Sequence, residues 1–468
     1  MIEIPPEVYA EIVSHFGSSD GRQSTAFANC QYRLGHLSRG TNDIASLKNL
    51  RLTSKLFSQA ATEVLFKSSI IRWPCESTYG SSSRFSDLNK AMSSAFTTPT
   101  YGLLPFIKNL EVCFINRKND PFTISGLAGS KEVEKCQESR EIPEKIPVAL
   151  NNLLKLEYFS FGVGWWESEY SGEGLGSGSG SAPEIDLQLL SSTIHNIAIG
   201  ISTLPLLTCL NLDLPCTHDF VELFNLVPVA VFSGLRQLHV AITDATGPGG
   251  SKSYHYWADE EGDDDECVPS SNLQQQYPNA KHAHGLFNIV EKCGNLQHLS
   301  IAGTQILDGN LLHWTPALLG LQYVQLARVK ISAENLIKLL SPGMGMILQS
   351  STLSTVSLYD VDLTAGTWAS VFRHLSLCPQ LSYLNPENLS YTRDGESSDL
   401  KEFPGRAWED CANLWSRNEE DEEELMRLVK VLVERAGGRA KYPSDRMEQF
   451  MLPEEEEEED DDSDSDSN

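Results

Sequence analysis

The sequence predicts an α/β fold in which strand–helix units repeat along the chain, between a small helical module and an acidic tail. Three observations lead to this prediction. A short leucine-rich motif recurs through the middle of the chain, apolar helical segments follow several of its copies, and the first 72 residues carry short amphipathic patterns instead of the motif. With 468 residues, the chain is too long for one ordinary compact core, which agrees with an elongated repeat domain.

The repeated motif has the form L-x-x-L-x-L, with isoleucine, valine or phenylalanine accepted in place of leucine. Its copies begin 49, 51, 28, 61, 25, 32 and 28 residues apart. The shorter spacings are close to the period of leucine-rich repeats, about 20–29 residues. We therefore expect an irregular leucine-rich-repeat-like solenoid at 100–400. The copies are IKNLEV (107–112), LEYFSF (156–161), LTCLNL (207–212), LRQLHV (235–240), LQHLSI (296–301), LQYVQL (321–326), LSTVSL (353–358) and a truncated LSYL (381–384).

Each motif is expected to form a strand, and the segment after it a helix. After the copy at 321–326, an apolar helical pattern follows that Ser332 can cap and that Pro342 and Gly343 can end. One unit cannot bury its apolar face alone, but stacked units can. The long spacings predict inserted loops of polar, glycine-rich or acidic composition. We expect these insertions to be disordered near 116–146, 166–184 and 244–281.

The C-terminal part predicts helices at 404–440 and a disordered acidic tail at 453–468. The stretch EEDEEELMRLVKVLVERAGG begins with acids, continues with basic residues and ends in glycine, which suits the helix dipole. Acidic runs, including the tail, account for most of the formal net charge of −28. The tail could bind basic partners, but a solvating role is the more common one for such a segment. Without a basic surface, no nucleic-acid partner is expected.

The cysteines and the apolar runs predict a cytoplasmic or nuclear protein. The ten cysteines are scattered and include no CxxC pair, so we expect reduced thiols. The chain does not begin with a positively charged region followed by an apolar one, the pattern of a secretory signal. The apolar runs are short and interrupted, so no membrane partner is expected.

The first 72 residues predict a helical module with an insertion at 17–46. The opening stretch IPPEVYAEIVSHF has proline at the helix start and one apolar face. The stretch LKNLRLTSKLFSQAATEVLFKSSII (47–71) predicts two more helices with a break near Ser54. Helices this short do not fold alone. Together they cover a small core with apolar surface left over, which either packs within the chain or enters the groove of a partner.

These two stretches resemble an F-box. The resemblance rests on Ile4, Pro5, Glu7, Ile12, Leu50, Arg51, Leu52, Lys55, Phe57, Leu65 and Phe66. It implies docking on a Skp-type adaptor and, through it, on a cullin, so that the repeats hold a protein substrate of a ubiquitin ligase. The implied adaptor-binding residues are Ile4, Pro5, Val8, Ile12, Leu50, Leu52 and Phe57. The insertion at 17–46 is longer than the family usually has at that point. A repeat scaffold with a degenerate F-box and no ligase is therefore the alternative.

Candidate chemical sites are few, and the sequence predicts neither an enzyme nor a cofactor. His282 and His284 lie near Cys267 and Cys293, but their spacing does not suit shared metal ligation. No serine, histidine and aspartate lie in a recognisable nucleophile motif, and GSGSGS (176–181) lacks the lysine of a phosphate loop. The pair Trp165-Trp166 could form a ligand platform, but apolar capping of the array is the interpretation we favour.

Overall fold

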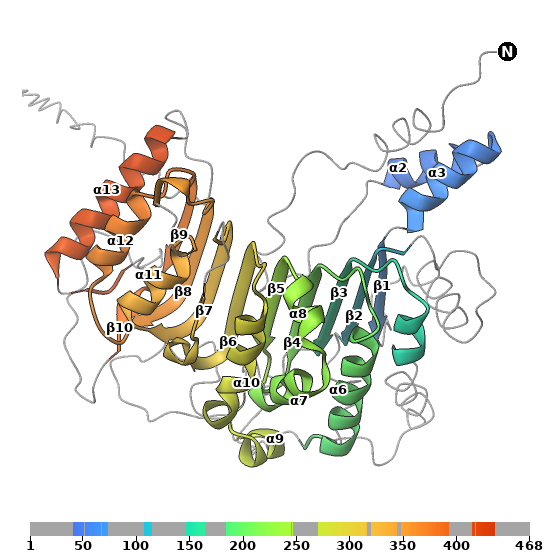
Figure 1. Ribbon diagram of the computed structural model, residues 1–468, viewed down its shortest axis with the longest axis horizontal. Coiled ribbons are helices and arrows are strands. Elements are labelled where there is room, and N and C mark those ends of the chain that lie inside the picture. The colour runs from blue at the N-terminus through green and yellow to red at the C-terminus, as the bar shows by residue number, and fades with distance from the viewer. Residues whose placement is uncertain are drawn as a thin grey trace, which may run out of the picture.

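One parallel sheet of ten strands contains every strand that the structure describes (Figure 1). This computed structural model describes residues 41–50, 52–66, 68–73, 107–114, 146–163, 184–244, 246, 270–315, 320–343, 348–392, 414–416 and 418–435. From β1 to β8, each strand lies beside the one before it in sequence, and β9 and β10 both pair with β8. The strands are β1 (Ser68–Trp73), β2 (Asn109–Phe114), β3 (Tyr158–Val163), β4 (Cys209–Leu214), β5 (Gln237–Ile242), β6 (His298–Asp308), β7 (Tyr323–Ile331), β8 (Thr355–Leu363), β9 (Tyr383–Glu387) and β10 (Ser390–Tyr391).

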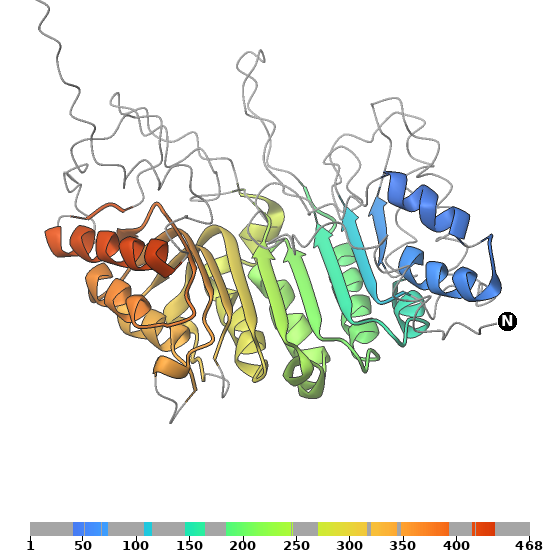
Figure 2. The same ribbon diagram turned by 90° about the horizontal axis from the view of Figure 1, so that it is seen from above.

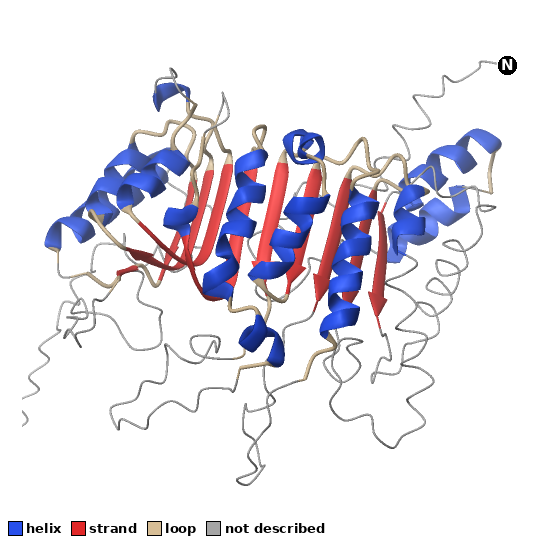
Figure 3. Cartoon of the chain, turned by 60° about the horizontal axis from the view of Figure 1, so that its bottom comes forward, coloured by secondary structure: helices blue, strands red, loops and turns tan. Residues whose placement is uncertain are grey.

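Helices α6, α7, α10, α11 and α12 lie on one face of this sheet (Figures 2 and 3). We call the opposite face the polar face, because most side chains that alternate toward it are polar. A strand order that follows the sequence means that successive units add to the same edge of the sheet. The labelled helices are α2 (Thr41–Leu50), α3 (Lys55–Phe66), α6 (Leu187–Ile201), α7 (Thr217–Leu226), α8 (Val229–Gly234), α9 (Asn272–Gln276), α10 (Asn279–Lys292), α11 (Ala333–Leu340), α12 (Trp368–Ser376) and α13 (Glu419–Arg435), with 3₁₀ turns η4 (Gly309–Leu311) and η5 (Leu348–Ser350). Residues 146–151 are helical as well.

Every motif copy forms a strand, as the sequence predicts. In all eight units the strand begins at the third residue of the motif. The motif's apolar positions point into the core because side chains alternate along a strand. In β4, for example, Leu210, Leu212 and Leu214 are each at most 1% exposed. Ser332 caps α11 by accepting a hydrogen bond from Asn335 N at 3.2 Å, which confirms the predicted helix start.

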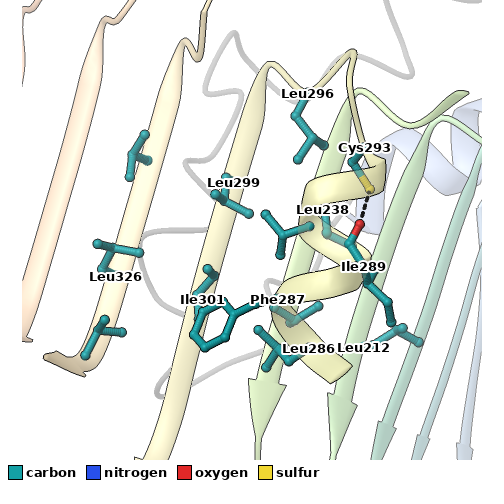
Figure 4. Packing of buried hydrophobic residues seen from close by; sticks show 14 of the residues in the cluster. Leu212, Leu238, Leu286, Phe287, Ile289, Cys293, Leu296, Leu299, Ile301 and Leu326 are labelled. Carbon is teal, nitrogen blue, oxygen red and sulfur yellow. Dashed lines mark hydrogen bonds between the residues drawn. The ribbon is translucent and has the colours of Figure 1, made fainter. Parts of the chain in front are cut away.

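The core lies between the sheet and its helices (Figure 4). Around α10, Leu286 and Ile289 pack toward the strands that carry Leu238 and Leu299, and all four side chains are fully buried. Cys293 ends this helix, and its thiol donates to Ile289 O at 3.2 Å. Burial raises the pKa of this thiol, so it stays a protonated core residue.

Three boundaries expected from the sequence are wrong. Helix α2 begins at Thr41, inside the insertion expected at 17–46. Strand β1 lies inside the N-terminal region expected to be helical, where Ile70 and Ile71 belong to a strand that pairs with β2. Helices α9 and α10 begin inside the insertion expected at 244–281, where Ser271 caps α9. Asparagine, serine and proline mark helix starts as well as loops, so these residues alone do not show whether a loop or a helix begins. The β-branched pair Ile70-Ile71 favours a strand, and its pairing with β2 completes that strand.

Other predicted segments lie outside the described residues. They include most of the insertions at 116–146 and 166–184 and the tail at 453–468. Of the helices expected at 404–440, the structure describes α13, whose first turn is acidic as predicted.

Helix α13 completes the helix layer by bonding both ends of α12. Asp421, fully buried, accepts from Ala369 N at 2.7 Å in the first turn of α12. Arg435 donates to Cys378 O at 2.7 Å and to Ser376 O at 2.8 Å, at the other end of that helix. These bonds satisfy backbone groups that a helix end leaves without intrahelical partners. The last unit of the array is therefore covered by a dedicated helix.

A polar ladder crosses the last strands at equivalent backbone bulges. Arg328, Asp360 and Asn388 have φ values of 57°, 50° and 52°, which non-glycine residues seldom adopt. Arg328 Nε lies 3.4 Å from Asp360 Oδ2, and Asn388 Nδ2 donates to Asp360 Oδ1 at 3.0 Å. Arg328 also donates to Thr304 O on β6. Side-chain bonds thus join β6, β7 and β8 to the segment between β9 and β10, where Asn388 lies.

Stability should depend on pH through Asp219 in the first turn of α7. Its carboxylate accepts from Cys216 N at 3.1 Å, and burial raises its pKa from 3.8 to about 7. The folded state therefore binds this proton more tightly than the unfolded state, and stability falls as the pH rises from 4 to 7. Asp219→Asn keeps an oxygen acceptor and removes the titration.

The free energy of unfolding of the wild type should fall relative to that of the variant by about 1.4 kcal/mol for each unit that the pH rises between 4 and 7. Denaturant unfolding at a series of pH values would measure it. A difference that stays constant from pH 5 to pH 8 would contradict the assignment.

Candidate protein-binding surfaces

The first candidate surface is the helical hairpin of α2 and α3. A turn at 52–54 joins the two helices, and Ser54 Oγ accepts from Phe57 N at 3.2 Å at the start of α3. This break lies where the sequence predicts it. The hairpin has a small core of its own, in which Leu47 and Ala61 are fully buried. Such a core is too small to stabilise an independent fold.

The predicted adaptor-binding residues of the hairpin differ in exposure. Leu50 and Phe57 pack against the Leu47–Ala61 core and are partly buried. Leu52, in contrast, is 86% exposed. Leu56, which the sequence analysis did not single out, is 42% exposed on the first turn of α3. Leu52 and Leu56, four residues apart in the sequence, thus leave much of their apolar surface in water. The other predicted residues, Ile4, Pro5, Val8 and Ile12, lie outside the described residues.

The second candidate surface is the polar face of the sheet. Two rows of side chains cross it, one from β2 to β9 and the other from β3 to β9, and each row holds one residue from each of these strands in register. The middle row consists of Glu111, Ser160, Asn211, His239, Ser300, Gln325, Ser357 and Asn385. The next row consists of Gly162, Asp213, Ala241, Ala302, Ala327, Tyr359 and Glu387. Between β2 and β9 the middle row is therefore polar, and the next row is mostly small.

A chain of hydrogen bonds runs along these rows. His239 Nε2 lies 3.0 Å from Asp213 Oδ1, and its Nδ1 lies 2.8 Å from Ser300 Oγ. Ser300 in turn donates to Gln325 Oε1 at 3.1 Å, and Tyr323 Oη donates to the same oxygen at 3.1 Å. His239 and Ser300 are at most 1% exposed, whereas the Asp213 side chain is 24% exposed. The buried members fix the orientation of the exposed carboxylate.

No sequence pattern predicts the Asp213–His239–Ser300 arrangement. His239 and Ser300 hold the fifth motif position on β5 and β6, Asp213 on β4 directly follows a motif copy, and no local motif joins the three. The three residue types are those of a hydrolytic triad, but such a nucleophile must reach its substrate. Ser300 is fully buried and its hydroxyl is bonded to Gln325. In this conformation the arrangement positions Asp213 and presents no accessible nucleophile.

The histidines considered as metal ligands lie on α10, not in a loop. The ring centroids of His282 and His284 are 6.4 Å apart, and His218 on α7 stacks on Tyr277 with centroids 4.0 Å apart. Burial lowers the pKa of both His218 and His282. Within the described ranges, no group of three or more histidine, cysteine or acidic residues has the arrangement of a metal site. Trp165 and Trp166 lie outside these ranges.

Comparisons with known proteins add no family to these observations. Models of known protein families give no match to the chain, and neither do the curated proteins. Among the described helices, none has both the length and the apolar character needed to cross a membrane. Function must therefore be argued from the hairpin and the polar face themselves.

Proposed function

We propose that this protein is a substrate-recognition subunit of a cullin-type ubiquitin ligase, acting in the cytoplasm or nucleus. In this proposal the α2–α3 hairpin is part of an F-box that docks on a Skp-type adaptor. The sheet and its helices are a leucine-rich-repeat solenoid that holds the target protein. The chain performs no covalent chemistry and needs no cofactor. It raises the local concentration of target lysines near the charged ubiquitin.

The exposure of Leu52 is the observation that carries the adaptor part of the proposal. A leucine that is 86% exposed on a hairpin with a two-residue core suits burial in a partner groove. Leu56, which is 42% exposed on the first turn of α3, adds a second exposed apolar side chain to the hairpin. Leu50 and Phe57 would then support the surface from behind, because they pack on Leu47 and Ala61.

The connection between hairpin and sheet supports the recruiting part. Helix α3 ends at Phe66, and β1, the first strand of the sheet, begins at Ser68. A connection this short fixes the distance between the two surfaces far better than a long flexible linker would. Fixed spacing suits a subunit that must present a bound target to an enzyme elsewhere in the complex.

The test is a binding measurement between the purified full-length protein and a purified Skp-type adaptor. We expect a stable complex with the wild type. Leu52→Asp combined with Leu56→Asp should weaken it at least tenfold, because apolar anchor residues each contribute about 2 kcal/mol to such interfaces. Pro5→Ala combined with Ile12→Asp should have the same effect.

Leu377→Asp is the matched control, since Leu377 is also exposed, at 61%, but follows α12 and lies between β8 and β9, near the edge of the sheet opposite to β1. It should bind the adaptor like the wild type. Equal binding by the hairpin variants would refute the assignment of the surface. An adaptor that does not bind the wild type at all would favour the alternative, a repeat scaffold with a degenerate F-box.

A further inference from the structure

Among the side chains of the polar face that the structure describes, carboxylates outnumber cations, and the two cations there, Arg328 and Lys330, have acidic partners. Arg328 bonds to Asp360, and Lys330 Nζ lies 3.9 Å from Asp308 Oδ2. Both cations are thus held by acids of the face itself. Its carboxylates come from Glu111, Asp213, Asp308, Asp360, Asp362 and Glu387. The part of the face that the structure describes therefore favours a cationic ligand.

Asp213 combines a fixed orientation with a side chain that is 24% exposed. Its Oδ1 is engaged with His239 Nε2 at 3.0 Å, and His239 is held by Ser300 from the other side of the ring. Because these partners are buried, the carboxylate cannot rotate freely. A fixed carboxylate loses little entropy when it binds, which strengthens its interaction with a ligand.

Gly162 leaves space beside the other oxygen of Asp213. It lies opposite Asp213 on the neighbouring strand β3. A Cβ atom built at Gly162 would lie 3.4 Å from Asp213 Oδ2, and no other residue comes within 4 Å of that position. The backbone of Gly162 has no positive φ that would require glycine. The missing side chain therefore opens the approach to Oδ2 without any conformational need.

We propose that Asp213, above Gly162, binds the ammonium or guanidinium group of a lysine or arginine side chain of the recruited protein. This inference rests on the proposed function, since it names the chemistry by which the polar face recognises its target. The cation pairs with Oδ2 while Oδ1 stays on His239. The single free oxygen makes the contact monodentate, so lysine and arginine both fit.

The test uses a fluorescein-labelled ten-residue peptide of glycine and serine with three arginines. A second peptide has citrulline, a neutral isostere, at the same positions. Anisotropy at low salt should show that Asp213→Asn weakens the arginine peptide about tenfold and leaves the citrulline peptide unchanged. Gly162→Val should weaken it by a similar factor, because the new side chain occupies the approach to Oδ2 while the charge remains. Melting temperatures establish that both variants are folded. If Gly162→Val is not folded, Gly162→Ala, which adds a smaller side chain, takes its place.

Glu334→Gln is the control, since Glu334 is exposed on α11, on the helix-covered face. It removes the same charge and should change the affinity less than twofold. An Asp213→Asn variant that behaves like this control would overturn the proposal. So would unchanged binding by Gly162→Val, because the attraction would then be long-range only. Adaptor binding by each variant is measured in parallel. Intact adaptor binding together with such a result would refute the subsite alone and leave the proposed function standing.

Discussion

Replacing Asp360 by alanine is expected to lower the free energy of unfolding by about 3–5 kcal/mol. Asp360 is the acid that accompanies Arg328, whose side chain is only 4% exposed. Removing the acid leaves a buried cation without its counter-charge, and that cost exceeds the modest gain of forming the pair. Asn388 would also lose its acceptor. The left-handed backbone at position 360 adds strain for alanine.

Chemical denaturation would measure this effect, with Lys330→Ala as the control. Lys330 pairs with Asp308 on the neighbouring strand, but both side chains are about 40% exposed, and the charged atoms are 3.9 Å apart. Exposed pairs contribute little, so the control should change stability by less than about 1 kcal/mol. Equal effects of the two substitutions would show that the ladder of Arg328, Asp360 and Asn388 does not stabilise the sheet.

Gly285→Ala is expected to destabilise the protein by about 2–3 kcal/mol, although alanine is the better helix former. Gly285 lies on α10 where it meets α7. A Cβ atom there would lie 2.7 Å from Val221 N and 2.9 Å from Val221 Cα. Backbone atoms cannot move aside as a flexible side chain can. The two helices would therefore have to separate, and the core beneath them would lose contacts.

Gly294→Ala is the matched control for this substitution. Gly294 follows Cys293, the C-cap of α10, and a Cβ atom built there has no neighbour within 4 Å. We expect its unfolding free energy to stay within about 0.5 kcal/mol of the wild type. A destabilisation of the same size at both positions would mean that the close approach of α7 and α10 is not the reason why a side chain at position 285 is unfavourable.

The sequence alone predicts the strands well because one periodic signal marks them. In each unit the motif's first residue is buried, as Leu156 and Leu296 illustrate, and the strand starts two residues later. Strand β1 is not predicted by this signal, because its sequence SSIIRW lacks the motif. Its strand character depends on pairing with β2, which lies more than thirty residues further along the chain.

The candidate surfaces were harder to predict, for a physical reason. The motif constrains the residues that point into the core, whereas Asp213, His239 and Ser300 occupy positions that it leaves free. Only the register of the strands brings them within hydrogen-bonding distance. The bulge residues Arg328 and Asp360 share a backbone conformation but no residue type. In the hairpin, the resemblance to an F-box pointed to Leu52, but it could not separate this exposed leucine from the partly buried Leu50.

The central claim is that one chain joins an adaptor-docking hairpin to a target-binding sheet. Affinity purification from cells, with the bound proteins quantified by mass spectrometry, tests it most directly. The full-length protein is compared with its Leu52→Asp/Leu56→Asp variant. The proposed function predicts a Skp-type adaptor and a cullin with the wild type, their loss with the variant, and other bound proteins that both forms retain. An adaptor and a cullin absent from the wild-type sample, or equally abundant in both, would contradict it.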